Sequence, residues 1–196
     1  MTYLLDTMIV SYFLQAGCEA DLANAAKRCP MALVGEVRKE LNSDKKRGGK
    51  PFLKWLATSG INERAIEIGS PEHDTLVALV DPLANAKNLG ERASVAVAAS
   101  DASFTFVTND TNGQRIALRE IWTPGERILG VAVFLRRLFE QGALTDPSTL
   151  DDVMAIVLDK VPQHQPTWWA SWRAALAAAK SLPPMAIDAT SAQLDS

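Results

Sequence analysis

Four acidic side chains stand where a short apolar run ends or where a helix is expected to begin. They are Asp6 after Tyr-Leu-Leu, Glu36 after Met-Ala-Leu-Val-Gly, Glu91 in Asn-Leu-Gly-Glu-Arg-Ala, and Asp110 after Phe-Thr-Phe-Val-Thr-Asn. In open parallel α/β sheets, ligands bind outside the carboxyl ends of the strands, so acids placed there are expected to converge. Converging carboxylates repel one another unless a cation lies among them, and oxygen ligands suit Mg²⁺ or Mn²⁺. The pattern predicts a metal-dependent phosphodiesterase.

Such a set of acids could hold one ion, or two ions about 3.5–4 Å apart. A bound metal lowers the pKa of a water ligand, which makes hydroxide available to attack phosphorus, and it stabilises charge on the leaving oxygen. We assign direct ligation to Asp6 and Asp110. Glu36 and Glu91 are expected to position water or the second ion.

The elements that must position these acids alternate between strand and helix as far as residue 122. Strands are predicted at residues 2–5, 31–34, 65–68, 104–108 and 121–122. Helices are predicted at 7–15, 19–28, 36–41, 51–58, 71–80, 89–99 and 111–119. This alternation favours an α/β fold, with a parallel sheet covered by helices on both faces.

The chain changes character after Pro124, where only helical patterns follow. Helices are expected at 125–141, 146–160 and 167–182, and the residues from Met185 onward are expected to be loosely ordered. The sequence therefore predicts two parts: a nuclease-like domain over 1–123, and a helical extension over 124–196 that packs on or beside it.

Composition limits the classes of function. The chain has 196 residues, 47% of them hydrophobic and 22% charged, with a net charge of −3, which argues against broad, non-specific coating of nucleic acid. No apolar run of about 18 residues is present, so no membrane span is expected. Cys18 and Cys29 lack metal-ligand spacing and are predicted to be reduced thiols of a cytoplasmic protein.

Basic residues gather close to Glu36 in the sequence. Between Glu36 and Lys54 lie seven Lys or Arg residues and three acids. Candidates for contacts to substrate phosphates, which position a strand without reading its sequence, are Lys45, Lys46, Arg47, Lys50, Arg92 and Arg115. The alternative is that the basic loop is only a solvated connection.

The four acidic motifs resemble those of PIN-domain ribonucleases, a family that includes VapC-type toxins of bacterial toxin–antitoxin pairs. The matching segments are Leu4-Leu5-Asp6-Thr7, Val34-Gly35-Glu36-Val37, Asn88-Leu89-Gly90-Glu91-Arg92-Ala93 and Val107-Thr108-Asn109-Asp110. The resemblance covers roughly residues 1–122 and implies a three-layer α/β/α sandwich with a parallel sheet. It also implies an endoribonuclease that uses Mg²⁺ or Mn²⁺, with Asp6, Glu36, Glu91 and Asp110 as the metal-binding set and Thr7 and Thr108 as supporting hydroxyls. RNA would be the substrate. A small antitoxin protein and a second copy of the chain are further partners to consider, and a stand-alone RNA-processing enzyme is the other physiological setting.

Other interpretations stay open. Asp6 and Asp110 could simply cap helices, and Glu36 could favour a helix dipole without any catalysis. The chain could be a non-catalytic PIN-like scaffold that binds a protein through its C-terminal helices, or a nucleotide-binding α/β protein. Trp168, Trp169 and Trp172 could stack on bases, but packing against the body of the protein is favoured.

Overall fold

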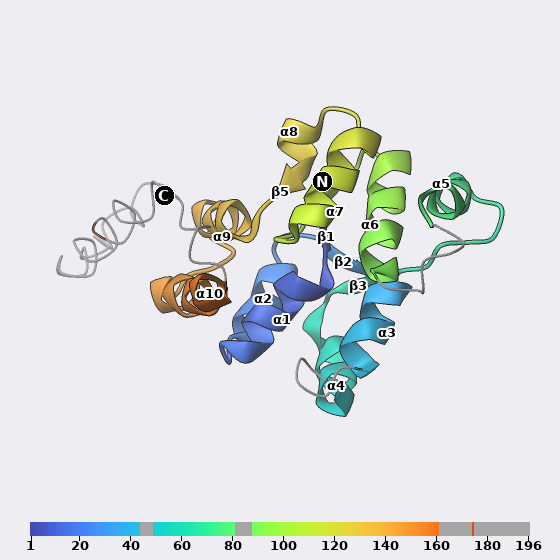
Figure 1. Cartoon of the computed structure of the whole chain (residues 1–196). Coiled ribbons are helices and arrows are strands. Elements are labelled where there is room, and N and C mark those ends of the chain that lie inside the picture. Colours follow the sequence, from blue (N-terminus) through green and yellow to red (C-terminus); the bar gives the residue numbers. More distant parts are fainter. Residues whose placement is uncertain (44–48, 81–87, 161–173, 175–196) are drawn as a thin grey trace, which may run out of the picture. The chain divides into compact units, whose positions relative to one another are not determined.

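The structure is a computed structural model that describes residues 1–43, 49–80, 88–160 and 174 (Figure 1). The chain divides into two compact units, Met1–Pro162 and Gln163–Ser196. All the elements described below belong to the first unit. The helix expected at 167–182 and the three tryptophans within it lie outside the described residues.

Five strands form one sheet in the order β3-β2-β1-β4-β5, and every neighbouring pair is parallel. The strands are β1 (Thr2–Leu5), β2 (Met31–Val34), β3 (Asn62–Arg64), β4 (Phe104–Val107) and β5 (Ile128–Leu129). The expected α/β class with a parallel sheet is confirmed. Parallel strands that are buried on both faces are composed of continuous apolar runs, and β2 is buried along its whole length.

The centre of the sheet is the pair β1 and β4. Its register places Tyr3 opposite Thr105 and Leu5 opposite Val107. Leu4, Leu5 and Val107 are fully buried, and full burial of a large aliphatic side chain stabilises a fold by about 1.5–3 kcal/mol. Both strands therefore end side by side within a dry core, which fixes the positions of the residues that follow them.

Ten helices are described in the first unit. They are α1 (Thr7–Gln15), α2 (Glu19–Ala26), α3 (Gly35–Ser43), α4 (Gly49–Ser59), α5 (Pro71–Leu79), α6 (Leu89–Ser100), α7 (Thr111–Glu120), α8 (Pro124–Arg127), α9 (Val131–Glu140) and α10 (Pro147–Lys160). Connections from β1 to β3 cross the sheet in one direction, and those from β3 to β5 cross in the other. Because such crossovers are right-handed, the two sets of helices belong on opposite faces, which is compatible with a three-layer sandwich.

The structure corrects two of the expected strands. Residues 121–122 do not form the last strand, because α7 ends just before them and Pro124 opens α8; the strand is β5, seven residues later. The third strand is β3 at Asn62–Arg64 rather than 65–68, and all three of its residues are exposed at the edge of the sheet. Because β5 pairs with β4, the sheet includes residues beyond 123.

Two further sequence expectations can be compared with the fold. No helix within the described residues is both long enough and apolar enough to cross a membrane. Cys18 and Cys29 are both free thiols and both buried, and burial raises the pKa of each.

Candidate active site

The topology itself marks one place on the sheet. From β1 the chain moves outward to β2 and β3, and it later returns to add β4 and β5 on the other side of β1. The strand order therefore reverses between β1 and β4, and open α/β sheets bind ligands outside the carboxyl ends of strands at this switch point. Asp6 directly follows β1 and Asp110 lies three residues beyond β4, so both acids lie there.

Asp6 is held from two sides. Its Oδ1 accepts from the amide of Thr7 at 2.6 Å, and its Oδ2 accepts from the Thr108 hydroxyl at 2.7 Å. Only 4% of the residue is exposed. Asp6 is also the N-cap of α1, in an extended conformation that suits this position. Each carboxylate oxygen has a second lone pair, so these bonds orient the group without using all of its acceptor capacity.

Thr108 links the two aspartates. Its hydroxyl donates to Asp6 and accepts from the Asp110 amide at 3.1 Å. Oδ1 of Asp110 accepts from the amides of Asn112 and Gly113 at 2.7 and 3.1 Å, so Asp110 caps α7. No donor among the described residues reaches its Oδ2. The two aspartates therefore do cap helices, and the cap of Asp110 leaves one oxygen available.

Glu91 lies in the first turn of α6 and is only 5% exposed. Its Oε1 accepts from Nδ2 of Asn112 at 3.3 Å. Gly113 makes room for this side chain, because a Cβ at that position would lie 2.9 Å from both Cγ and Cδ of Glu91. The asparagine and the glycine on α7 are thus shaped around the carboxylate on α6. Neither residue was expected to belong to the site.

Glu40 is the acid of α3 that the structure joins to this place. Its Oε2 accepts from the Thr7 hydroxyl at 2.6 Å, and its Oε1 accepts from the Gly90 amide at 2.9 Å. It therefore ties α3 to the starts of α1 and α6. Glu40 was not among the acids predicted from the sequence. A signal was present, because Glu40 follows Glu36 by four residues and so lies on the same face of a helix.

Glu36 is placed differently. It lies in the first turn of α3, and its Oε1 is 3.7 Å from Nζ of Lys39. No hydrogen bond in the described part of the chain connects Glu36 with Asp6, Glu91 or Asp110. The structure thus brings three of the four expected acids together, adds Glu40, and leaves Glu36 one helical turn away.

Burial and mutual repulsion shape the electrostatics of the site. Desolvation is the main cause that raises the pKa of Asp6 to about 6, and the charges of Glu40 and Asp110 add to it, against the hydrogen bonds from Thr108 and Thr7. Desolvation also raises the pKa of Glu91 to about 7, with contributions from Asp110 and Asp6, while Asn112 and Arg92 lower it. Burial, and to a lesser degree the neighbouring carboxylates, therefore disfavour the charged forms of Asp6 and Glu91.

Among the described residues, no basic side chain is paired with these acids. No ion pair with a described Lys or Arg involves Asp6, Glu40, Glu91 or Asp110. Arg92 follows Glu91 and is half-buried, and its Nε is buried without a hydrogen-bond partner in the described chain. Across the described residues, no group of three or more His, Cys, Asp or Glu side chains is placed so that it could hold a metal ion as it stands. Carboxylate charge is concentrated here without a finished coordination sphere.

The expected phosphate-binding residues fall into two sets. Lys45, Lys46 and Arg47 lie outside the described residues, as does the side chain of Lys50, whose backbone belongs to α4. Arg115 is exposed on α7, and its Nη2 donates to Oδ1 of Asn112 at 3.0 Å. Asn112 therefore connects Arg115 to Glu91.

Comparison with known proteins identifies no family. No family model, no curated protein and no solved structure matches this chain. The resemblance to PIN-domain ribonucleases rests on the four acidic motifs alone.

Proposed function

We propose that this chain is a divalent-metal-dependent endoribonuclease, with a site of the PIN-domain kind at the switch point between β1 and β4. The observation that carries the proposal is the burial of Asp6 and Glu91 beside Asp110 without a Lys or Arg of the described chain paired to them. Burying an unpaired carboxylate is costly, and a site that retains several of them needs a cation from solution.

The donor set fits Mg²⁺ or Mn²⁺. All candidate ligands are carboxylate oxygens, which these ions prefer. Mg²⁺ keeps several waters and usually takes only one or two direct carboxylates, so a set of acids that does not form a closed cage is compatible with it. Asp6 and Asp110 would hold the ion, with Glu91 beside them.

The residues of this chain have distinct parts in the proposed reaction. Thr7 and Thr108 fix the orientation of Asp6, Thr108 also fixes the backbone of Asp110, and Glu40 holds Thr7 in place. When bound, the metal would supply an activated water and stabilise negative charge on the leaving oxygen. Hydrolysis would add the OH of a water to phosphorus and break one P–O bond of the RNA backbone, with the leaving oxygen taking up the remaining proton.

Cleavage of a pooled, end-labelled RNA tests the proposal, with Mn²⁺ or Mg²⁺ compared with EDTA. Asp6→Asn and Asp110→Asn should both abolish metal-dependent cutting, and since Asn caps helices about as well as Asp, both variants should stay folded. Asp74→Asn is the matched control, because Asp74 is an exposed acid of α5. Cutting that survives both site changes would show that these two acids are structural, and no metal-dependent cutting by the wild type would favour a non-catalytic scaffold.

A second pair of variants separates the two acids of α3. Glu40→Gln and Glu36→Gln make the same change on the same helix, one turn apart. Because Glu40 is bonded to Thr7 and Gly90, Glu40→Gln should reduce cutting by at least tenfold more than Glu36→Gln. A larger loss of cutting in Glu36→Gln than in Glu40→Gln would indicate that Glu36, rather than Glu40, belongs to the site.

A further inference from the structure

The exposed face of α7 carries a stripe of basic and apolar side chains. Arg115 lies three residues after Asn112, and Leu118 and Arg119 lie three and four residues after Arg115. Residues at these spacings share one face of a helix. Trp122 lies just beyond the helix end, after Ile121, whose backbone is extended. Trp122 is 83% exposed and Leu118 is 59% exposed. We call these residues, Arg115, Leu118, Arg119 and Trp122, the α7 stripe.

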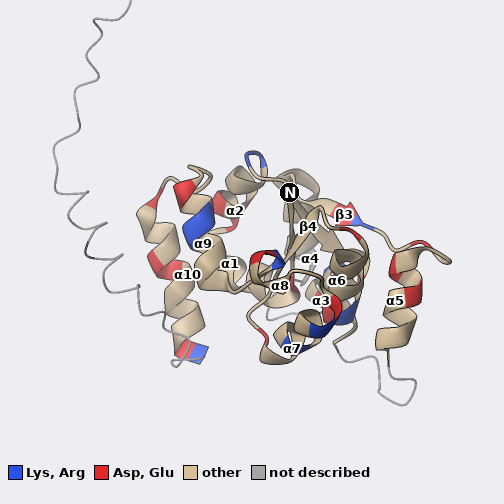
Figure 2. Ribbon diagram, turned by 90° about the horizontal axis from the view of Figure 1, so that it is seen from above, with Lys and Arg blue, Asp and Glu red and all other residues tan. Residues whose placement is uncertain are grey.

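Neither guanidinium group of the stripe is paired with an acid that the structure describes. Neither Arg115 nor Arg119 forms an ion pair with an acid in the described chain, whereas Arg136 pairs with Glu140 at 2.6 Å. Glu120, the one acid within α7, follows Arg119 directly and is therefore rotated by about 100° around the helix axis. On a protein of net charge −3, α7 thus presents a local positive face, marked by its blue positions in Figure 2.

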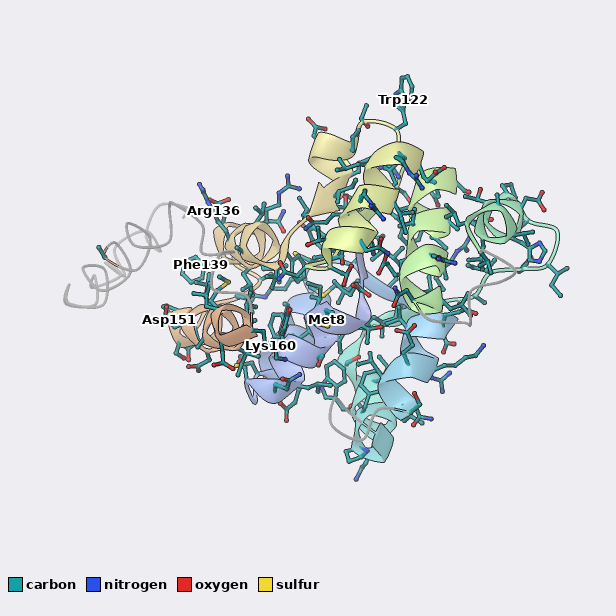
Figure 3. All side chains as sticks on the ribbon, viewed as in Figure 1. Met8, Trp122, Arg136, Phe139, Asp151 and Lys160 are labelled. Atoms are coloured by element: carbon teal, nitrogen blue, oxygen red, sulfur yellow. The ribbon has the colours of Figure 1, made fainter. Side chains whose placement is uncertain are left out.

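Trp122 is held by its backbone while its ring stays free. Nη1 of Arg127 donates to the Trp122 carbonyl at 3.3 Å, and the same guanidinium bonds the carbonyls of Ala98, Asp101 and Phe104. The neighbouring Ile121 is buried. The ring projects away from the body of the unit (Figure 3). A single exposed aromatic is ordinary, but a fixed backbone under a free ring is suited to stacking.

The stripe begins at the candidate active site. Asp110 caps the start of α7, and Asn112 in its first turn bonds both Glu91 and Arg115. The helix has ten residues, so it leads about 15 Å away from the acids to Trp122. Two arginines and an exposed aromatic ring therefore follow the candidate active site along α7 and just past its end.

We propose that the α7 stripe is a track for single-stranded RNA, in which Arg115 and Arg119 bind phosphates and Trp122 stacks on an unpaired base. Grooves that hold single strands combine cations that follow the backbone with aromatic rings on which bases stack. A duplex offers no unpaired base to an exposed ring, so the proposal specifies a single strand. It rests on the proposed function, because the bound strand is the one presented to Asp110.

The test is binding of a fluorescein-labelled single-stranded RNA to the full chain, measured by anisotropy in EDTA at several salt concentrations. The combined change of Arg115→Ala and Arg119→Ala should weaken binding and reduce the slope of log affinity against log salt by about 1.4, at about 0.7 for each phosphate contact. Trp122→Ala should weaken binding about 5- to 100-fold at an unchanged slope, and Trp122→Phe should retain most of the affinity. Arg136→Ala is the matched control and should bind as the wild type does.

The outcomes separate this inference from the proposed function. Wild-type affinity in all of the stripe variants, an equal loss in Arg136→Ala, or tighter binding of duplex than of single strand would each overturn the track. In the first of these cases the face would be better explained as a protein-docking surface. Cutting is read in a separate reaction with Mn²⁺, so an uncut RNA that still shows the expected binding pattern would overturn the nuclease and leave the track standing. Melting curves of each variant confirm that it is folded.

Discussion

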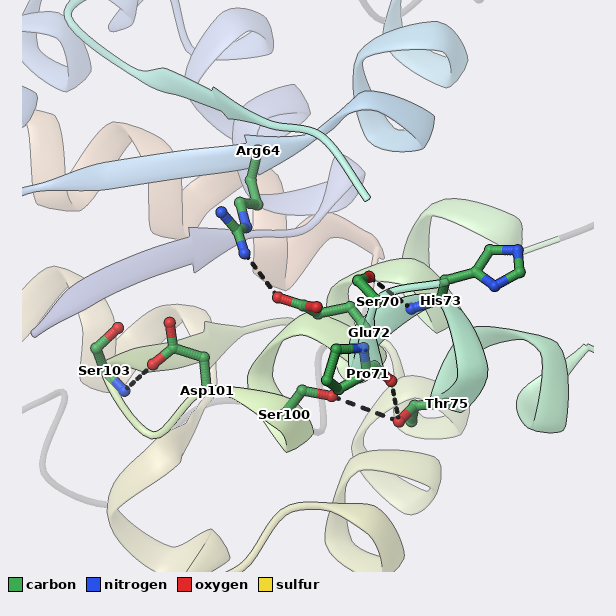
Figure 4. A network of polar contacts seen from close by, with 9 residues as sticks. All are labelled: Arg64, Ser70, Pro71, Glu72, His73, Thr75, Ser100, Asp101 and Ser103. Atoms are coloured by element: carbon green, nitrogen blue, oxygen red, sulfur yellow. Dashed lines mark hydrogen bonds and ion pairs between the residues drawn. The ribbon is translucent and has the colours of Figure 1, made fainter. Parts of the chain in front are cut away.

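Carboxylates are buried at two places in the described part of this fold, and their pKa values are shifted in opposite directions at the two places. At the β3 edge, Glu72 is 8% exposed, yet its pKa is lowered by its own backbone amide and by Arg64, whose Nη2 lies 2.6 Å from Oε1 (Figure 4). At the switch point, Asp6 and Glu91 are equally buried, but desolvation and neighbouring acids raise their pKa values to about 6 and about 7.

The difference lies in whether the chain supplies its own cation. Glu72 stands in a network that joins β3, α5 and α6, in which Ser70 caps α5 and Thr75 meets Ser100. That network is complete without any ligand. The acids of the switch point have hydrogen bonds that orient them but no paired Lys or Arg among the described residues. A fold that pairs the buried Glu72 with Arg64, but leaves the buried Asp6 and Glu91 without a paired Lys or Arg among the described residues, favours a site for a cation from solution.

The largest expected effect is the pH dependence of stability without metal. Since the folded pKa of Asp6 is raised from 3.8 to about 6, the folded state keeps its proton longer than the unfolded state. The stability that protonated Asp6 contributes is therefore fully present below about pH 4 and is lost as the pH rises through about 6. The free energy of unfolding in EDTA should fall by about 3 kcal/mol over that range for this group alone.

Asp6→Asn isolates this contribution in urea unfolding. The variant should show a smaller fall between about pH 4 and pH 7, and at neutral pH it should be at least as stable as the wild type. Glu72 acts in the other direction: its lowered pKa gives stability that is present above its ordinary value and is lost as the pH falls through the folded value. A wild type whose stability rises steadily from pH 4 to pH 7 would contradict the account of Asp6.

The next effect in size is stabilisation by metal. A ligand that binds only the native state stabilises it by about 2.7 kcal/mol at a concentration one hundred times its Kd. Mn²⁺ should raise the Tm of the wild type, and Asp110→Asn should remove the rise, while Asp74→Asn should keep it. Thermal unfolding with and without Mn²⁺ measures this. An undiminished rise in Asp110→Asn would place the ion elsewhere.

A smaller effect is expected from breaking the ion pair of the complete network. Arg64→Ala leaves Glu72 buried without its cation, and because the Arg64 side chain is 43% exposed, the cost should be about 1–2 kcal/mol rather than that of a fully buried pair. Arg38→Ala breaks a pair whose two side chains are each 43% exposed, and it should cost less than about 1 kcal/mol. Equal costs in urea unfolding would show that Glu72 does not depend on Arg64.

The central part of the site could be predicted from the sequence because its strands are short, continuous apolar runs. The runs before Asp6 and before Thr108 are buried on both faces, so their ends can be located without a structure. Parallel pairing then brings those ends to one edge, which is confirmed for β1 and β4. The edge strands could not be predicted in the same way. β3 has no buried residue and β5 has only two residues, so neither leaves an apolar pattern.

Glu40 shows what local patterns leave out. Its role depends on contacts with the Thr7 hydroxyl and the Gly90 amide, which are 33 and 50 residues away in the chain. Only the packing of α3 against α1 and α6 brings these groups together. The sequence selected Glu36 because it stands nearest the strand end, whereas position along a helix face decides which acid reaches the site.

The smallest expected change in stability comes from Gly113→Ala, and it tests how closely α7 is fitted to Glu91. Ala favours a helix over Gly by about 0.5–1 kcal/mol, but the new Cβ would lie 2.9 Å from Cγ and Cδ of Glu91, so that side chain must move. These effects oppose each other, and the free energy of unfolding should change by less than about 1 kcal/mol. RNA cutting should fall much further, since misplacing a group in a site by about 1 Å can cost about 100-fold in rate. Gly125→Ala is the matched control, because a Cβ there would meet nothing within 4 Å. If Gly113→Ala cut RNA as fast as the wild type, Glu91 would work equally well from a displaced position. The negative charge of Glu91 would then matter more than its exact position against α7.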